Sequence, residues 1–514
     1  MPAMTQTASE FRDDNHYLAL QARDARFDGL FFTGVTSTGI YCRPVCRVRL
    51  PKRENCRFFN QAAQAERAGF RPCLRCRPEL APRRPGYAQA DPAKVWSTQD
   101  ASSILALQAA ELIDAPESSG HAALGIAQLA RRLGVSDRHL RRIFEAHFGV
   151  SPLQYLQTRR LLCAKQLLTD TLLPIKQVAT LSGFASLRRF NAAFVQHYAL
   201  QPGQLRAGTR SGVVARSSSL LVKLAYRPPY DVIALLRFFA LRQINGVEDI
   251  DLAAKRPRLS RTLALELDGK RHGGWFSASF DSTVQRVELR VSDSLLEVLP
   301  WLMARVRSLL DLDADPQAIN SRLHASFPHG DGLRLPGCID GFELAVRAVL
   351  GQQITIAGAR TLAQRLVERF GEPLETPLPG LNRLFPSATT LANASGDALG
   401  QLGIVKQRQL AIRALANAVL EQRLQLYAGA DVAATMATLK TLPGIGDWTA
   451  QYIAMRALHW PDAFPAGDIA LQRALGLQAV KNPAQAASAA AQAWQPWRSY
   501  ATIRAWAGAH RDTP

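Results

Sequence analysis

Five of the seven cysteines lie between positions 42 and 76, and four of these form two close pairs. Three residues separate Cys42 from Cys46, and two separate Cys73 from Cys76. Two such pairs joined by a loop suit tetrahedral Zn²⁺, because each pair spans one edge of the tetrahedron. Independent thiols would not need this spacing. The sequence therefore predicts a zinc site with Cys42, Cys46, Cys73 and Cys76 as ligands, and Cys56 as a packing residue.

A second group of residues that could do chemistry lies towards the C-terminus. Leu442-Pro-Gly-Ile-Gly446 places two glycines before a helical segment, where exposed backbone N–H groups can bind a DNA phosphate. Asp468 follows 22 residues after Gly446 and precedes another helical stretch. The simplest role for Asp468 is to cap the helix that begins near Ile469.

The chain has 514 residues, and 62 Lys and Arg against 42 Asp and Glu give a formal net charge of +20. This surplus favours a polyanionic partner, either nucleic acid or an anionic membrane surface. No run of about 18 apolar residues occurs. The first 15 residues lack the apolar core of a secretory signal. These observations argue against a membrane and favour nucleic acid as the partner.

Two segments rich in Pro, Gly, Ser or Arg, Ala81–Gly86 and Ala207–Ser219, indicate linkers. The basic residues concentrate before the second one. Residues 1–210 carry 29 basic and 16 acidic residues, against 33 and 26 in residues 211–514. Both parts can contact DNA, and we expect electrostatic attraction to contribute more to binding by the first part.

The segment between the linkers has a helical pattern that occurs twice. Apolar residues recur at three- and four-residue spacings over 126–133 and again over 175–179, and a glycine-containing turn follows each run. Ser136 is a suitable N-cap for the helix after the first turn. Helix, turn and helix, twice over, predict two helix-turn-helix units.

The C-terminal half begins with a different period. Apolar and polar residues alternate over 263–267 and over 287–291, and Asp268-Gly269 is a turn signal, so half-buried strands are expected here. Helical periods return after about residue 338. The predicted fold class is multidomain and mainly α with α+β parts. The expected domains are a head at 1–82, a double helix-turn-helix at 90–206, a linker at 207–219, an α+β domain at 220–326 and an all-α domain at 327–514.

The segments GIYCRPVCRVRLPKRENCRFF and AGFRPCLRCRPE resemble the N-terminal domain of the Ada adaptive-response family. In that family four cysteines bind one zinc ion, and the first also takes a methyl group irreversibly from DNA methyl-phosphotriesters. The resemblance implies a small zinc-bound α/β head in which Cys42 is both ligand and methyl acceptor. Zinc holds a thiolate deprotonated, so the nucleophile exists at neutral pH. The arginines that could hold the DNA backbone nearby are Arg43, Arg47, Arg49, Arg71, Arg75 and Arg77.

Methylation of Cys42 would change the charge of this centre. Four thiolates on Zn²⁺ leave it at about −2, and three thiolates with one thioether leave it at about −1. At roughly 8 Å and an effective dielectric of about 40, one unit charge is worth about 1 kcal/mol per phosphate. The hypothesis is a covalent electrostatic switch that turns on sequence-specific DNA binding and transcription, with RNA polymerase as a further partner.

The segment VATLSGFASLRRFNAAFVQHYALQPGQLR resembles the AraC-type signature, in which two helix-turn-helix units enter successive major grooves. Arg is the commonest reader of guanine in the major groove. The alternative for each single residue is a phosphate contact. Candidate readers of base edges are Arg138, His139, Arg141, Arg188 and Arg189.

The segment TLPGIGDWTAQYIAMRALHWPDAFPAGDIALQRAL resembles the helix-hairpin-helix superfamily of base-excision DNA glycosylases. RLPGCIDGFELAVRAVLGQQIT, YRPPYD and WRSYATIRAW point to its AlkA-type 3-methyladenine DNA glycosylase II family, over roughly 218–508. The resemblance implies a TBP-like α+β domain at 220–326 and a helix-hairpin-helix glycosylase domain at 327–514.

By this resemblance Asp468 is the catalytic carboxylate, because glycosidic cleavage passes through a cationic sugar that a carboxylate stabilises. Capping is compatible with this role, since a helix N-terminus favours the ionised carboxylate. Gly444, Gly446 and Thr449 are the expected DNA contacts of the hairpin. Gln353 occupies the position of the family's DNA wedge, where a polar side chain departs from the apolar pattern.

The family's aromatic pocket positions are occupied by Trp448, Tyr452 and Trp506. Such a pocket selects cationic 3-methyladenine and 7-methylguanine by stacking and cation–π attraction, and core packing is the alternative role for each residue. Bifunctional members place a Lys where this chain has Trp448, so water is the expected nucleophile, without strand cleavage. Cys338 is the only cysteine after Cys163, which argues against an iron–sulfur cluster; zinc is the only cofactor expected, with no organic one.

The Pro-Cys-His-Arg motif of the O6-alkylguanine methyltransferase domain does not occur in the sequence. The chain is therefore expected to be an Ada-type regulatory head fused to a monofunctional DNA-3-methyladenine glycosylase. The resemblance implies that it acts on double-stranded DNA in a bacterial cytoplasm, in association with the nucleoid. Two alternatives stay open. In the first, the glycosylase half is only a DNA-binding scaffold of a transcription factor, against which Asp468 and the hairpin argue. In the second, the head only targets a glycosylase to DNA.

Overall fold

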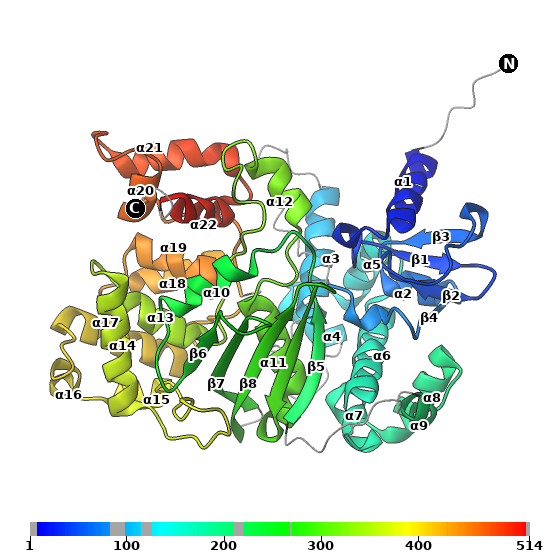
Figure 1. Ribbon diagram of the computed structural model, residues 1–514, viewed down its shortest axis with the longest axis horizontal. Helices are drawn as coiled ribbons and strands as arrows, with labels where there is room; N and C mark the ends of the chain where they lie inside the picture. Colours follow the sequence, from blue (N-terminus) through cyan, green and yellow to red (C-terminus); the bar gives the residue numbers. More distant parts are fainter. Residues whose placement is uncertain are drawn as a thin grey trace.

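The computed structural model describes residues 8–82, 98–114, 126–171, 173–208, 219–267, 270–428 and 430–509. Most of the two expected linkers and the turn Asp268-Gly269 lie outside the described residues. In Figure 1 the head lies at the upper right, a five-stranded sheet lies in the centre, and the C-terminal helices lie on the left.

The head is built on a four-stranded sheet with the strand order β3-β1-β2-β4. β1 pairs with β2 and β3 in the antiparallel direction, whereas β2 and β4 are parallel. Its elements are α1 (Ala8–Ala22), η1 (Ala25–Phe27), β1 (Phe32–Val35), β2 (Ile40–Cys42), η2 (Arg53–Asn55), β3 (Cys56–Phe59), α2 (Ala62–Arg67), β4 (Arg71–Pro72) and η3 (Pro78–Leu80).

Two helix-turn-helix units follow the head. In each, the second helix begins after a serine N-cap: Ser136 accepts a hydrogen bond from the His139 N–H, and Ser186 accepts one from the Arg189 N–H. The predicted cap at Ser136 is thereby confirmed. The helices are α3 (Thr98–Asp114), α4 (Ile126–Arg132), α5 (Asp137–Phe148), α6 (Pro152–Asp170), α7 (Ile175–Leu181), α8 (Leu187–Tyr198) and α9 (Pro202–Gly208).

Helix α6 connects the two units and also contacts α2 and η3 of the head and strand β5 of the next domain. Leu161 of α6 and Phe194 of α8 belong to the same buried cluster as Val222 and Leu224 of β5. Because this apolar surface is shared, the second helix-turn-helix unit packs directly against the α+β domain.

The α+β domain has an antiparallel sheet with the strand order β5-β9-β8-β7-β6. The predicted alternation is confirmed in β9, where Val287, Leu289 and Val291 are buried and Arg290 is exposed. The elements are β5 (Ser219–Ala225), α10 (Val232–Ala240), β6 (Glu248–Asp251), β7 (Arg258–Leu267), β8 (Lys270–Asp281), β9 (Arg286–Ser292), η5 (Asp293–Val298) and α11 (Leu299–Leu309).

The remainder is helical, with buried clusters on both sides of the α18–α19 hairpin. A buried ionic network fastens the sheet to α13, since Arg261 bonds to Glu343 (2.7 Å) and to Glu248 (3.0 Å). The elements are α12 (Pro316–Leu323), α13 (Gly341–Leu350), α14 (Ile356–Phe370), α15 (Ala388–Asn393), α16 (Gly396–Gly400), α17 (Lys406–Leu420), α18 (Val432–Thr441), α19 (Asp447–Arg456), α20 (Ile469–Ala474), α21 (Pro483–Ala490), η6 (Ala491–Trp494) and α22 (Arg498–Ala509). In the described part of the chain, no helix is both long and apolar enough to cross a membrane.

Gly341 begins α13 at a close approach of two segments, because a Cβ there would lie 1.9 Å from the Leu426 carbonyl oxygen. We expect Gly341→Ala to lower the free energy of unfolding by about 1–3 kcal/mol or more, since backbone must move to admit the methyl group. Thermal denaturation measures this effect. Gly508→Ala is the control, because a Cβ at Gly508 in α22 meets no atom within 4 Å. Equal melting temperatures for the two variants would contradict the close approach.

Candidate metal centre and candidate active site

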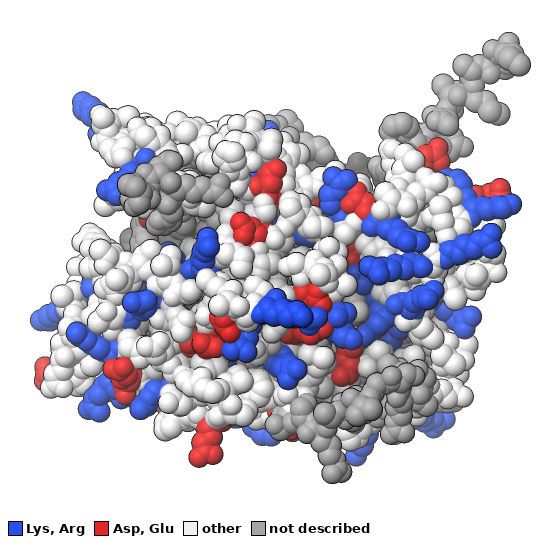
Figure 2. Space-filling view, viewed as in Figure 1, with Lys and Arg blue, Asp and Glu red and all other residues white. Residues whose placement is uncertain are grey.

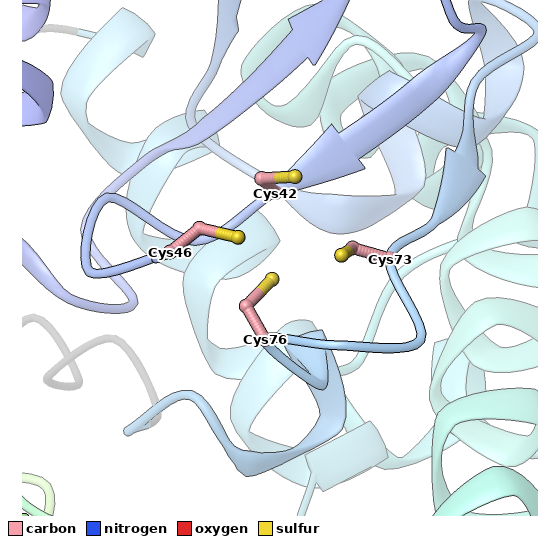
Figure 3. Close-up of side chains that lie close together, drawn as sticks. All are labelled: Cys42, Cys46, Cys73 and Cys76. Atoms are coloured by element: carbon pink, nitrogen blue, oxygen red, sulfur yellow. The ribbon is translucent and has the colours of Figure 1, made fainter. Parts of the chain in front are cut away.

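The four cysteines of the head converge because of the parallel pairing of β2 with β4. Tyr41 pairs with Pro72 in that register, so Cys42 and Cys73 leave the two strands side by side. All four Sγ atoms lie within 4.8 Å of one another. Figure 3 shows the four sulfurs pointing towards a common centre. In a regular ZnS₄ tetrahedron with bonds of about 2.3 Å the sulfurs lie about 3.8 Å apart, so the donor set and its spacing fit zinc.

Arginines surround this centre, and they differ in what they contact. Arg43 is buried and donates to both carboxylate oxygens of Asp28. Arg77 is half-buried and bonds to Asp170 and Glu79. These two side chains therefore support the fold, which corrects their expected role at the DNA backbone. The exposed arginines near the centre are Arg47, Arg49, Arg71 and Arg75.

Figure 2 shows Lys and Arg side chains gathered over the head, on the right of the view. A surface of this charge suits a phosphate backbone.

The second site centres on Asp468, the N-cap of α20. Its Oδ1 accepts hydrogen bonds from the Leu471 backbone N–H (2.7 Å) and from the Trp506 Nε1–H (3.0 Å). Its Oδ2 accepts one from the Trp448 Nε1–H (2.9 Å). Asp468 caps the helix as the sequence suggested, but two indole groups from α19 and α22 also hold its carboxylate.

The three aromatic residues expected to form a pocket lie together beside this carboxylate. The rings of Trp448 and Tyr452 are stacked, with centroids 5.4 Å apart and planes 14° apart. The ring of Trp506 lies 6.4 Å from that of Tyr452. All three are half-buried, so they offer π-faces at a partly open surface rather than in a closed core.

The structure adds three residues that the sequence analysis missed. Arg456 donates to the Tyr452 hydroxyl (2.7 Å), and the Arg242 guanidinium lies 3.7 Å from the ring centroid of Phe238. Burial raises the pKa of Tyr452, but Arg456 and Arg242 outweigh burial and hold that pKa below its ordinary value. Arg456 is four residues from Tyr452 on one helix, a spacing that could have identified it. Arg242 and Phe238 lie at the end of α10 in another domain, and no local pattern signals them.

The residues of the hairpin that were expected to contact DNA differ in their exposure. Gly446 is exposed at the start of α19, so its backbone is open to a phosphate, and Gly444 is half-buried with φ = +76°. Thr449 is only 2 % exposed, and its hydroxyl accepts a hydrogen bond from Gln352 (3.0 Å). The Thr449 side chain therefore braces the hairpin from inside, and the expected DNA contact of Thr449 stays a prediction. Gln353 is exposed with φ = +53° at the turn after α13, beside this brace.

The candidate base readers lie at the starts of α5 and α8. Arg138, Arg188 and Arg189 are exposed. Arg141 is exposed too, but it forms a two-point ion pair with Asp137 that DNA would have to displace. His139 is half-buried. Their contacts to bases stay predictions.

Comparison with known families assigns the parts of the chain separately. Family models match the metal-binding domain of Ada over residues 15–79 and a helix-turn-helix domain over 129–208. The AlkA N-terminal domain matches over 221–340, and the HhH-GPD superfamily of base-excision DNA repair proteins matches over 346–499. The fold and both sites thus define a metal-binding, DNA-binding regulatory head joined to a base-excision glycosylase.

The whole arrangement occurs in a relative. The chain is 36% identical over 505 residues to a probable bifunctional transcriptional activator/DNA repair enzyme AlkA of Mycobacterium tuberculosis, with 95% of each chain covered. It belongs to this family of Ada–AlkA fusion proteins.

Separate proteins resemble its two halves. DNA-3-methyladenine glycosylase 2 of Escherichia coli is 36% identical over 284 residues, which cover 55% of this chain and 95% of that protein. The bifunctional transcriptional activator/DNA repair enzyme Ada of Escherichia coli is 34% identical over 148 residues, which cover 29% of this chain and 36% of that protein.

The cysteine cluster predicts one zinc ion per chain. We expect elemental analysis of the purified protein to find one equivalent, and Cys46→Ser to lose it. Removal of zinc should unfold the head, because a structural zinc site contributes about 10 kcal/mol or more to folding. Cys163→Ser, outside the cluster, should retain the metal. Full zinc content in Cys46→Ser would exclude the four-cysteine site.

Proposed function

We propose that the chain removes alkylated purines such as 3-methyladenine and 7-methylguanine from DNA by hydrolysis, as a monofunctional glycosylase. We propose further that its head accepts methyl groups from DNA methyl-phosphotriesters and regulates transcription. The observation that carries the glycosylase activity is the Asp468 carboxylate, held by two indole N–H groups beside the stacked pair Trp448 and Tyr452.

The hydrogen bonds of Asp468 suit hydrolysis. An ionised carboxylate offers about four acceptor sites, and the Leu471, Trp506 and Trp448 donors occupy three of them. The free site on Oδ2 is available to orient water or to face the cationic sugar. The aromatic faces beside it attract a cationic purine flipped out of the duplex. Trp448 carries no amine, so water rather than a Schiff base completes the reaction.

The head supports a transfer at Cys42. The Cys42 thiolate sulfur attacks the methyl carbon, the carbon–oxygen bond breaks, and its electron pair stays on the phosphate oxygen. The products are a thioether on Cys42 and an ordinary phosphodiester. Bound zinc would keep the thiolate available at neutral pH. The exposed arginines Arg47, Arg49, Arg71 and Arg75 suit the phosphates around the lesion.

Loss of negative charge at Cys42 supports the regulatory role, since it strengthens attraction to phosphates. Arg138, Arg188 and Arg189 are exposed at the starts of α5 and α8, which supports their proposed contacts with promoter DNA. RNA polymerase is the partner proposed for activation of transcription.

We expect Asp468→Asn to bind methylated DNA while base release falls by about a hundredfold or more. Asn caps a helix about as well as Asp, so the fold should persist. Chromatography of the freed bases measures the reaction. Asp431→Asn is the control, because Asp431 likewise caps a helix, α18, by accepting from the Ala434 N–H. Equal release by both variants would reduce Asp468 to a cap, and absence of release from the unaltered protein would favour the DNA-binding scaffold.

We expect Cys42→Ala to retain no label from DNA that carries labelled methyl-phosphotriesters. Peptide mapping of the unaltered protein should place the methyl group on Cys42. Cys56→Ala is the matched control, since Cys56 is buried in the head and its thiol donates to the Lys52 carbonyl outside the cluster. Label on any other cysteine of the unaltered protein would reject Cys42 as the acceptor.

A further inference from the structure

Arg227 joins the two halves of the chain. It lies between β5 and α10, and its side chain is fully buried at 0 % exposure. It donates to the Asp28 carbonyl oxygen in the head (2.9 Å). It also donates to the carbonyl oxygens of Asp313 (2.7 Å) and Ala314 (3.0 Å) in the C-terminal half. Burial lowers its pKa to about 10, so it stays charged at neutral pH.

Asp28, which accepts from Arg227, also binds the arginine next to Cys42. The Asp28 carboxylate accepts from Nε (2.8 Å) and Nη2 of the buried Arg43. Arg43 follows Cys42 directly and donates through Nη1 to the Cys76 carbonyl oxygen (3.0 Å). Its backbone N–H points to the Cys76 Sγ (3.4 Å). Two residues thus separate the Arg227 guanidinium from the cluster.

The head and Arg227 pack closely around Gly29. Gly29 follows Asp28 with φ = +78°, and a Cβ there would lie 2.0 Å from the Pro82 carbonyl oxygen and 3.3 Å from the Arg227 Nη2. Any other side chain at Gly29 would displace mainly Pro82, whose carbonyl oxygen also accepts from Arg227 Nη2 (3.5 Å).

Cys73, the other member of the second cysteine pair, is bound in a similar way from the helix-turn-helix region. Lys165 of α6 is buried and donates to the Cys73 carbonyl oxygen (3.0 Å) and to Glu79. The carbonyl oxygens of both Cys73 and Cys76 are therefore bound by buried cations. Arg43 belongs to the head itself, and its partner Asp28 is anchored from the C-terminal half.

We propose that Arg227 is a positioning residue of the methyl-acceptor site, so that the glycosylase half helps to hold the cysteine cluster of the head in place. This inference rests on the methyl-acceptor function proposed above. Partners behind metal ligands orient those ligands, and their loss typically costs about 10- to 100-fold in metal affinity or activity. Arg227 acts through Asp28 and Arg43, so the lower end of this range applies.

Arg227→Gln in the full chain tests the proposal through two rates. We expect zinc to transfer to a chromogenic chelator about tenfold faster than from the unaltered protein, and methyl transfer to slow by a similar factor. Arg227→Lys retains the charge with three donors in place of five, and should give intermediate rates. The matched control is Arg504→Gln, which removes a buried guanidinium (3 % exposed) that bonds within the C-terminal half. Its zinc and methyl-transfer rates should equal those of the unaltered protein.

A double-mutant cycle of Arg227→Gln with Arg43→Gln tests the route through Asp28. If both residues act on one path, the double variant loses zinc more slowly than the product of the two single-variant effects predicts. The two effects are then not additive in free energy. Unchanged rates in Arg227→Gln, equal effects in Arg504→Gln, or full additivity would each overturn the proposal. Absence of label on the unaltered protein would instead reject the methyl-acceptor function, while the zinc-release rates still decide the role of Arg227.

Discussion

Buried cations bound to backbone carbonyl oxygens are the interaction on which the assembly of this chain depends. A buried guanidinium or ammonium group is costly unless its donors are satisfied, so the carbonyls around it must keep their positions. Arg227 imposes this constraint between the head and the C-terminal half, and Lys165 imposes it between the head and α6. Carbonyl acceptors belong to the backbone, so these contacts position whole segments rather than single side chains.

The same principle shapes the base-excision site. Arg456 also donates to the carbonyl oxygens of Pro336 (2.9 Å) and Gly337 (3.0 Å), and these bonds connect α19 to the segment before α13. Its contact with the Tyr452 hydroxyl then places the middle ring of the aromatic group. Trp448 and Trp506 turn their polar edges to Asp468, so their ring faces are left for stacking, and Trp448 already stacks on Tyr452 with one of them. One set of hydrogen bonds therefore orients both the carboxylate and the surface that receives the base.

Much of this organisation was predictable from the sequence. The paired cysteines, the serine cap at Ser136 and the alternation in β9 depend on residues that are close in the chain, and their spacing carries the information. Asp468 and the three aromatic residues were identified through a motif that resembles a family. Arg43 and Arg47 could not be told apart in this way, because both are arginines beside a zinc-binding cysteine and only burial separates them. The burial of the Thr449 side chain could likewise not be seen in the sequence.

The sequence by itself determined which residues could bind zinc, cap helices and supply a carboxylate, because these properties follow from residue type and local spacing. Only the tertiary structure decided which of the basic residues face solvent and which join domains. Arg227 shows the reason most clearly. Its partners are 145 or more positions away at Pro82 and Asp28, and 86 or more away at Asp313 and Ala314, and no local pattern encodes contacts across such distances.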